Sequence, residues 1–233
     1  MDEEQSILDF NFWPSFTDLM LSLVLIMILV VFIIYASLEA STIKLRHIET
    51  RQLKLITDIA TQFHVQAKRS EGAEGAIYEL AIYQDAIIIK NEPTIQRFSF
   101  STQILFDPDS YQLKPSGQQA IGAVGALIKQ QLGAILEIQI QGHADTDSTK
   151  RFDSNLNLGA QRAIEVFEFM EDSVGIDPSH SLMSATSFGE YKPVQRTTVD
   201  STYNRIRLET DNATPELKTR NRRIELLLFY RSQ

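Results

Sequence analysis

Cysteine is absent from the 233 residues of the chain. This absence excludes a disulfide framework, a thiol nucleophile and a thiolate metal site. Positive charge is scarce as well, because 22 Lys and Arg stand against 30 Asp and Glu and leave a net charge of −8. Nucleic acid is therefore not an expected partner, since neutralising phosphates requires a basic surface.

Charge is also absent from the segment between Leu19 and Leu38. Twenty helical residues span about 30 Å, which is the thickness of the hydrocarbon core of a bilayer. The sequence predicts a transmembrane helix over residues 14–38 after a cytoplasmic tail at 1–13. A cleaved signal peptide is not expected, because that tail begins "MDEEQSILDF" with four acids and the first basic residue is Lys44.

The orientation of this span has evidence on both sides. The basic residues near it follow the span, at Lys44, Arg46, Arg51 and Lys54. The positive-inside rule taken alone would place the C-terminal part in the cytoplasm, but the rule is weakest where a long soluble domain follows.

An aspartate, Asp18, stands at the head of the uncharged segment. Ser15, Asp18 and Ser22 have the spacing i−3, i, i+4 and so form one polar stripe on the helix. Acidic residues within a membrane generally face a partner or a water-filled path. Either Asp18 serves such a path, which other helices must complete, or it caps the N-terminus of the helix.

Residues 39–75 are predicted to form a helical linker that ends in the small residues of "SEGAEG". Two sets of residues recur every seven positions and form a thin apolar seam; they are Leu38, Leu45, Gln52, Ile59 and Ser41, Ile48, Leu55, Gln62. The seam is compatible with pairing of two copies or with packing on the domain that follows.

The remaining residues, 76–233, alternate strand-like and helix-like segments. Strands are expected in "AIIIK", "RFSFSTQILF", "AILEIQIQ", "SLMSATSF" and "RRIELLLFYR", and helices in the segment that Pro115 opens and around Leu158 to Met170. The predicted fold class is α+β, with one N-terminal transmembrane helix, a helical linker and a mixed sheet covered by helices on one face.

Several blocks in this region resemble the OmpA-like peptidoglycan-binding domain. They are "ILFDPDSYQLKPSGQQAI", "GHADTD", "NLNLGAQRAIEV", "FGEYKPV" and "NRRIELLL", in the order of that family. The resemblance implies that Asp145 and Arg162 hold the free amino acid end of a peptidoglycan stem peptide, with Asn155 and Leu158 positioning the backbone nearby. One carboxylate and one guanidinium suit the ammonium and carboxylate that diaminopimelate carries on one carbon.

Other chemistries have weaker support. His143, Asp145 and Asp147 alternate and could form a metal site, but a fourth ligand is lacking. The basic run "KTRNRR" could bind phosphate, although a solvated strand entrance with ion pairs is the simpler interpretation. No nucleophile arrangement is present in the sequence, so we expect neither an enzyme nor a cofactor nor a bound metal.

An acidic residue in a single span, joined to an OmpA-like domain, resembles the B subunit of a stator motor, the family of flagellar MotB. Trp13, Pro14, Phe16 and Asp18 lie in the block that carries this resemblance, and the acidic start is most similar to ZorB of the Zorya antiphage systems. The resemblance implies an inner-membrane protein with a periplasmic C-terminal domain and an ion, expected to be a proton, carried by Asp18. It also implies a homodimer inside a ring of a multi-span A subunit (ZorA-like or MotA-like) and attachment to peptidoglycan. A flagellar stator subunit and a passive wall tether are the alternatives.

Overall fold

The computed structural model describes residues 13–72, 75–82, 85–196 and 200–231. All of the predicted tail at 1–13 except Trp13 lies outside the described residues. The chain divides into two compact units, Met1–Arg46 and His47–Gln233. The boundary between them falls inside the first helix, α1 (Trp13–Gln62).

The described part of the first unit is the N-terminal part of α1. It contains an apolar segment that is long and apolar enough to cross a membrane, judged by length and composition. Its large apolar side chains between Leu19 and Leu38 are exposed. A continuous apolar surface of this kind needs lipid or another protein to cover it. The predicted span at 14–38 lies within this segment.

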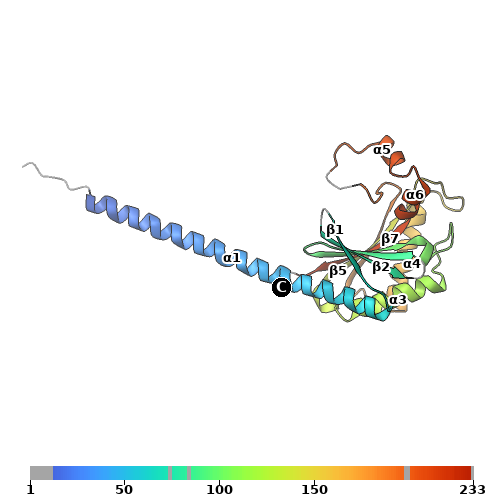
Figure 1. Ribbon diagram of the computed structural model, residues 1–233, viewed down its shortest axis with the longest axis horizontal. Coiled ribbons are helices and arrows are strands. Elements are labelled where there is room, and N and C mark those ends of the chain that lie inside the picture. The colour runs from blue at the N-terminus through green and yellow to red at the C-terminus, as the bar shows by residue number, and fades with distance from the viewer. Residues whose placement is uncertain (1–12, 73–74, 83–84, 197–199, 232–233) are drawn as a thin grey trace, which may run out of the picture. The chain divides into compact units, whose positions relative to one another are not determined.

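The second unit contains a seven-stranded sheet with the order β1-β2-β3-β4-β7-β5-β6 (Figure 1). The strands are β1 (Lys68–Gly72), β2 (Gly75–Ile82), β3 (Asp85–Asn91), β4 (Ile95–Ser101), β5 (Ile135–His143), β6 (Leu182–Gly189) and β7 (Arg223–Tyr230). The helices after α1 are α2 (Thr102–Leu105), α3 (Pro115–Lys129), η1 (Leu132–Ala134), α4 (Asn155–Asp172), α5 (Arg205–Thr210) and α6 (Pro215–Asn221). β5 and β6 are parallel and the other neighbouring pairs are antiparallel. The predicted α+β fold with a mixed sheet is confirmed.

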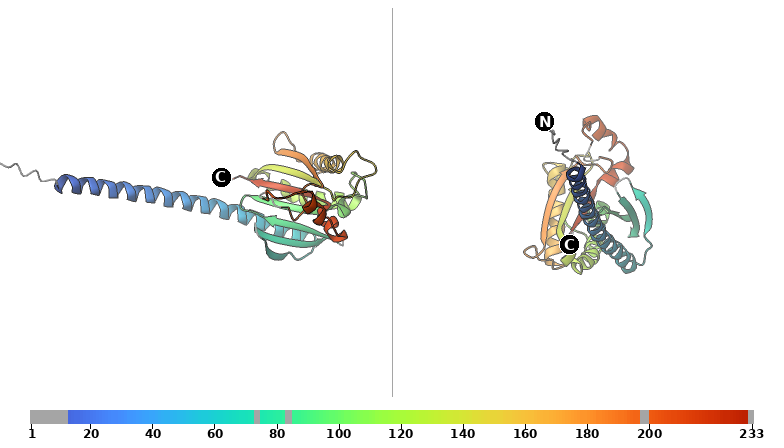
Figure 2. Two further views of the ribbon diagram at one scale, coloured as in Figure 1. Left: turned by 90° about the horizontal axis from the view of Figure 1, so that it is seen from above. Right: turned by 90° about the vertical axis from the view of Figure 1, so that its left-hand side faces the viewer.

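One face of the sheet forms the hydrophobic core. Strand register aligns Leu80 with Ile87, Ile87 with Phe100 and Phe100 with Ile224, and all four side chains are fully buried. Because side chains alternate between the two faces of a strand, this row lies on a single face. Apolar residues of α3, α4 and the C-terminal part of α1 belong to the same core. The two further views in Figure 2 show these helices and the strands of the unit.

The C-terminal part of α1 is an integral part of the second unit. Ile48, Leu55 and Ile59 of the predicted seam are buried in the core, each at most 3% exposed. Gln52, also on the seam, donates hydrogen bonds from Nε2 to the carbonyl oxygens of Glu92 (3.0 Å) and Ile95 (3.3 Å). In this part of the chain the seam therefore packs on its own domain, which is one of the two expected arrangements.

The structure differs from the expected linker at 39–75. α1 extends to Gln62, and β1 pairs with β2 where the sequence suggested a flexible connection. The expected strand at 97–106 also ends early, because Ser101 Oγ accepts a hydrogen bond from Gln103 N (3.3 Å) and starts α2. A side-chain cap of this kind stabilises a helix start over continued strand.

We expect Leu55→Ala to lower the free energy of unfolding by about 2–5 kcal/mol, because it leaves a cavity in the core. Leu53→Ala is the matched control, since Leu53 lies on the same helix and is 38% exposed. Denaturant unfolding of both variants measures the difference. Equal effects of the two substitutions would contradict the assignment of residues after His47 to the folded domain.

Candidate functional site

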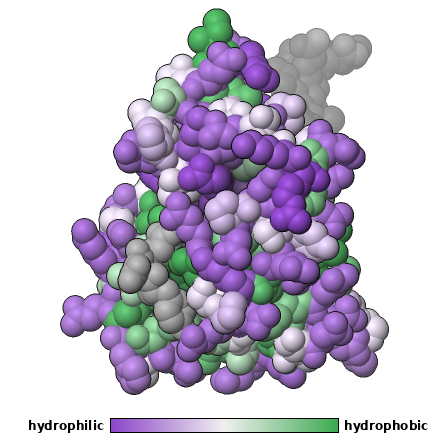
Figure 3. Space-filling model, turned by 90° about the vertical axis from the view of Figure 1, so that its right-hand side faces the viewer, coloured by the Kyte–Doolittle hydropathy of each residue, from purple (hydrophilic) through white to green (hydrophobic). Residues whose placement is uncertain are grey.

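The predicted site residues of the second unit gather where β5 ends and β7 begins. His143 at the end of β5 pairs with Arg223 at the start of β7, and the loop after His143 leads to α4. These strand ends lie toward the right-hand side of the view in Figure 1. Figure 3 shows the surface on that side, where hydrophilic residues predominate and apolar ones are scattered.

Asp145 is a buried carboxylate with its oxygens already engaged. Its side chain is 5% exposed, and Oδ2 lies 2.5 Å from a guanidinium nitrogen of Arg222. Oδ1 accepts a hydrogen bond from Asp147 N (3.0 Å). Asn155 at the start of α4 donates from Nδ2 to the carbonyl oxygens of Asp145 (3.0 Å) and Asp147 (2.9 Å). The predicted Asp145 and Asn155 are thus together, and Asn155 holds the loop backbone.

The first turns of α4 pack tightly against β5. Ser154 caps the helix by accepting a hydrogen bond at Oγ from Asn157 N (3.1 Å). Leu158 is 6% exposed and buried beneath the helix. A Cβ on Gly142 would lie 2.0 Å from the carbonyl oxygen of Gly159, so glycine at position 142 allows the helix to approach the strand. Leu158 and Arg162 are one helical turn apart and therefore share a face.

Arg162 is 5% exposed and has no carboxylate partner among the described residues. Its Nε donates to the carbonyl oxygen of Ser110 (2.7 Å), and its guanidinium carbon lies 5.1 Å from the centroid of the Phe106 ring. Burial lowers the pKa of Arg162 to about 10; Asp109 and Asp145 act in the opposite direction, and Arg222 lowers the pKa further. The pair predicted from sequence, Asp145 and Arg162, is therefore close enough to interact electrostatically without a direct ion pair.

The face of β5 and β7 that points away from the hydrophobic core carries a buried charge cluster. Glu225 accepts hydrogen bonds from Arg97 (2.6 Å) and Arg223 (2.7 Å). His143 is 1% exposed and stacks on Phe188 with centroids 5.3 Å apart, and its Nε2 lies 3.5 Å from Glu225. Burial lowers the pKa of His143 to about 4. The pKa of Glu225 lies well below its usual value because Arg223, His143 and Arg97 outweigh the opposing effect of burial.

The alternative metal site at His143, Asp145 and Asp147 is not assembled. His143 faces Glu225 and Phe188, Asp145 pairs with Arg222, and Asp147 Oδ1 lies 2.5 Å from Lys218 Nζ. Within the described ranges no group of three His, Cys, Asp or Glu side chains could hold a metal ion. The three side chains therefore contact three different sets of neighbours and do not converge on one point.

Sequence reasoning missed Arg222 and Asp109. Arg222 belongs to the run "KTRNRR", in which Lys218, Arg222 and Arg223 form ion pairs. Arg223 is 6% exposed, so this part of the run is buried rather than solvated. Asp109 has a left-handed backbone (φ 53°) and accepts hydrogen bonds from the Thr149 hydroxyl and from Lys150 N (3.0 Å), which joins two loops. The signal that could have found Arg222 is its place directly before the last strand, in the same block as the family resemblance.

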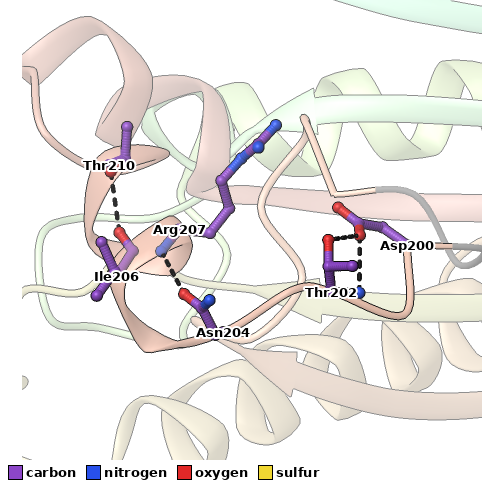
Figure 4. A pocket seen from close by; sticks show the side chains of 6 residues that line it. All are labelled: Asp200, Thr202, Asn204, Ile206, Arg207 and Thr210. Carbon is purple, nitrogen blue, oxygen red and sulfur yellow. Dashed lines mark hydrogen bonds between the residues drawn. The ribbon is translucent and has the colours of Figure 1, made fainter.

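An open depression of about 340 Å³ lies elsewhere, in the segment between β6 and β7 (Figure 4). Its lining residues are Asp200, Thr202, Asn204, Ile206, Arg207 and Thr210. Several of them bond to one another: Asn204 Oδ1 accepts from Arg207 N (3.1 Å), and Thr202 donates to Asp200 (2.7 Å). The depression contains none of the predicted site residues.

In the first unit, the described helix α1 begins at Trp13, so Asp18 lies beyond its first turn. Asp18 therefore does not cap this helix, and that alternative is wrong. Ser22 donates its hydroxyl to the carbonyl oxygen of Asp18 (2.9 Å). Ser15, Asp18 and Ser22 are all helical, as the predicted polar stripe requires.

Comparisons with known proteins concern the second unit and its fold. Residues 105–207 match the model of the OmpA family. A MotB-like protein from Desulfovibrio vulgaris has a similar structure, with 20% identity over 80% of this chain and 99% of that chain and a TM-score of 0.58. The periplasmic domain of Helicobacter pylori MotB has 17% identity over 70% of this chain and 87% of that chain, with a TM-score of 0.51. These likenesses concern the fold. No curated protein matches the chain.

We expect the stability of the second unit to fall as pH drops from about 6.5 to 4.5. An unfolded His titrates near 6.5, whereas His143 in the fold stays neutral down to about pH 4, so the unfolded state binds the proton first. The difference over the full window is about 3 kcal/mol. Glu225 also contributes to stability, because its pKa is lowered in the fold; this contribution is lost only at lower pH, below the pKa of an unfolded Glu.

His143→Phe keeps an aromatic ring against Phe188 and should flatten the pH dependence between 6.5 and 4.5. His180→Phe is the control, because the side chain of His180 is 83% exposed. Denaturant unfolding at several pH values measures both. An unchanged slope in His143→Phe would contradict the role given to this histidine.

Proposed function

We propose that this chain is the B subunit of an ion-driven stator motor that is anchored to peptidoglycan. The observation that carries the proposal is the combination, in one chain, of an acidic residue in an apolar helix with an OmpA-like domain whose buried Asp145 and Arg162 lie close together. A tether needs only the second feature, whereas a motor needs both.

The domain supports wall attachment through the chemistry of its site. A stem peptide ends in an amino acid that carries an ammonium and a carboxylate, and Asp145 and Arg162 offer the two opposite charges. Arg162 is suited to a carboxylate because its described partners are carbonyl oxygens and an aromatic ring. Asn155 fixes the loop backbone beside Asp145, and Leu158 supports the helix that carries Arg162.

Asp18 supports ion transport through its position on α1. An ionisable side chain in a span faces a partner or water, and the stripe of Ser15, Asp18 and Ser22 ends at an apolar stretch. One helix cannot complete a path, so the proposal includes a ring of a multi-span A subunit around two copies of this chain. Each charge moved across the membrane yields about 2.3 kcal/mol per 100 mV. Asp18 would accept and release a proton, with Ser15 and Ser22 as supporting groups.

The proposed topology places the N-terminus in the cytoplasm and the OmpA-like domain in the periplasm of an inner-membrane protein. A wall-binding domain has to reach peptidoglycan, and this requirement outweighs the positive charges at Lys44, Arg46 and Arg51 after the span. The proposed biological role is antiphage defence of the Zorya type. It rests on the likeness of the entry block, from Trp13 to Asp18, to ZorB.

Asp18→Asn tests the motor. The variant should still co-purify from membranes with a multi-span partner, because the amide keeps the size of the side chain, and it should lose phage protection in the host. Asp58→Asn, a substitution on the same helix at an exposed ion pair with Lys54, should keep both properties. Partner identification by mass spectrometry and plaque counts give the two readouts.

If Asp18→Asn protects as well as the wild type, or if the chain purifies without a multi-span partner, a passive wall tether replaces the motor. If the variant abolishes swimming motility instead of phage protection, the chain is a flagellar stator subunit.

A further inference from the structure

The candidate site contains two guanidinium groups but one buried carboxylate between them. Arg222 pairs with Asp145, while Arg162 is held by carbonyl oxygens and by the ring of Phe106. The two arginines are close enough that Arg222 lowers the pKa of Arg162. A zwitterionic amino acid needs a cation for its carboxylate and an anion for its ammonium group. Arg162 is available as the cation, whereas Asp145, the anion, is already paired with Arg222.

Asp145 and Arg222 differ in how far their side chains are exposed to solvent. The side chain of Asp145 is 5% exposed and that of Arg222 is 32% exposed. Besides Asp145, the described side-chain contact of Arg222 is with the Thr219 hydroxyl (3.0 Å). Its main chain is fixed independently, because its carbonyl oxygen accepts a hydrogen bond from Thr102 N (3.0 Å). The Arg222 side chain can therefore turn toward solvent without moving β7, whereas Asp145 cannot leave.

We propose that Arg222 is an internal counter-ion that a ligand ammonium group must displace from Asp145, so that Arg222 sets the specificity of the site. This inference rests on the proposed attachment to peptidoglycan. A primary ammonium on the same carbon as a carboxylate can replace the guanidinium at Asp145 while its carboxylate binds Arg162. Departure of Arg222 also removes the repulsion that it exerts on Arg162.

The exchange has a consequence for ligand selection. A ligand whose amine is acylated can offer only its carboxylate, so it would bind at Arg162 and leave the Arg222 pair intact. Its affinity should not depend on Arg222. A zwitterionic ligand has to break the existing ion pair first, and its measured affinity is reduced by that cost.

The test is calorimetric titration of the full-length chain in detergent with meso-diaminopimelic acid and with its N,N′-diacetylated derivative, in which neither end keeps an ammonium group. Arg222→Gln should bind meso-diaminopimelic acid about fivefold more tightly than the wild type, in line with the modest strength of a partly exposed ion pair. The acetylated ligand should bind both proteins equally. Arg220→Gln is the matched control, because Arg220 is exposed near the end of α6, two residues before Arg222, and should behave like the wild type. Thermal unfolding confirms that each variant is folded.

A folded Arg222→Gln variant that binds meso-diaminopimelic acid more weakly than the wild type, or equally, would overturn the counter-ion role. Asp145→Asn separates this result from failure of the proposed function. If the wild type binds and Asp145→Asn does not, the site is the ligand site and only the role of Arg222 is decided. If the wild type binds neither ligand, the proposed wall attachment and the inference fail together.

Discussion

The buried carboxylate of Asp145 is the interaction on which the candidate site depends. A charge in this position is costly unless it is paired and hydrogen-bonded. Arg222 and the backbone of Asp147 meet that requirement from the start of β7 and from the loop. Asp145 therefore ties the end of one strand to the start of its neighbour and fixes the loop that leads to α4.

The surrounding structure fixes the backbone around Asp145. The close approach of Gly142 and Gly159 sets α4 against β5, and Asn155 closes the loop from the other side. Beneath the strand ends, the ion pair between Arg97 and Glu225 joins β4 to β7 on the face opposite the core. Rigidity of this kind matters for recognition, because a preformed site loses less conformational entropy when a ligand binds.

Much of the fold followed from the sequence, because the strands alternate polar and apolar residues and the helices bury one stripe. Asp145 and Arg162 could be found because they stand in recognisable blocks. The sequence could not show whether α1 packs on its own domain, because the same seven-residue spacing suits a coiled coil and a helix on a sheet. In the structure the hydrogen bonds of Gln52 join α1 to the domain. The Arg222 contact to Asp145 joins residues 77 positions apart, and only the pairing of β5 with β7 brings them together.

Attachment to the cell wall through Arg162 is the central claim, and co-sedimentation with purified peptidoglycan sacculi tests it most directly. Arg162→Lys keeps the positive charge and removes the two-pronged geometry that suits a carboxylate. Arg151→Lys, at an exposed position, is the control. We predict that the wild type and Arg151→Lys sediment with the sacculi and that Arg162→Lys stays in the supernatant. Sedimentation of Arg162→Lys at the wild-type level, or a wild type that remains soluble, would contradict it.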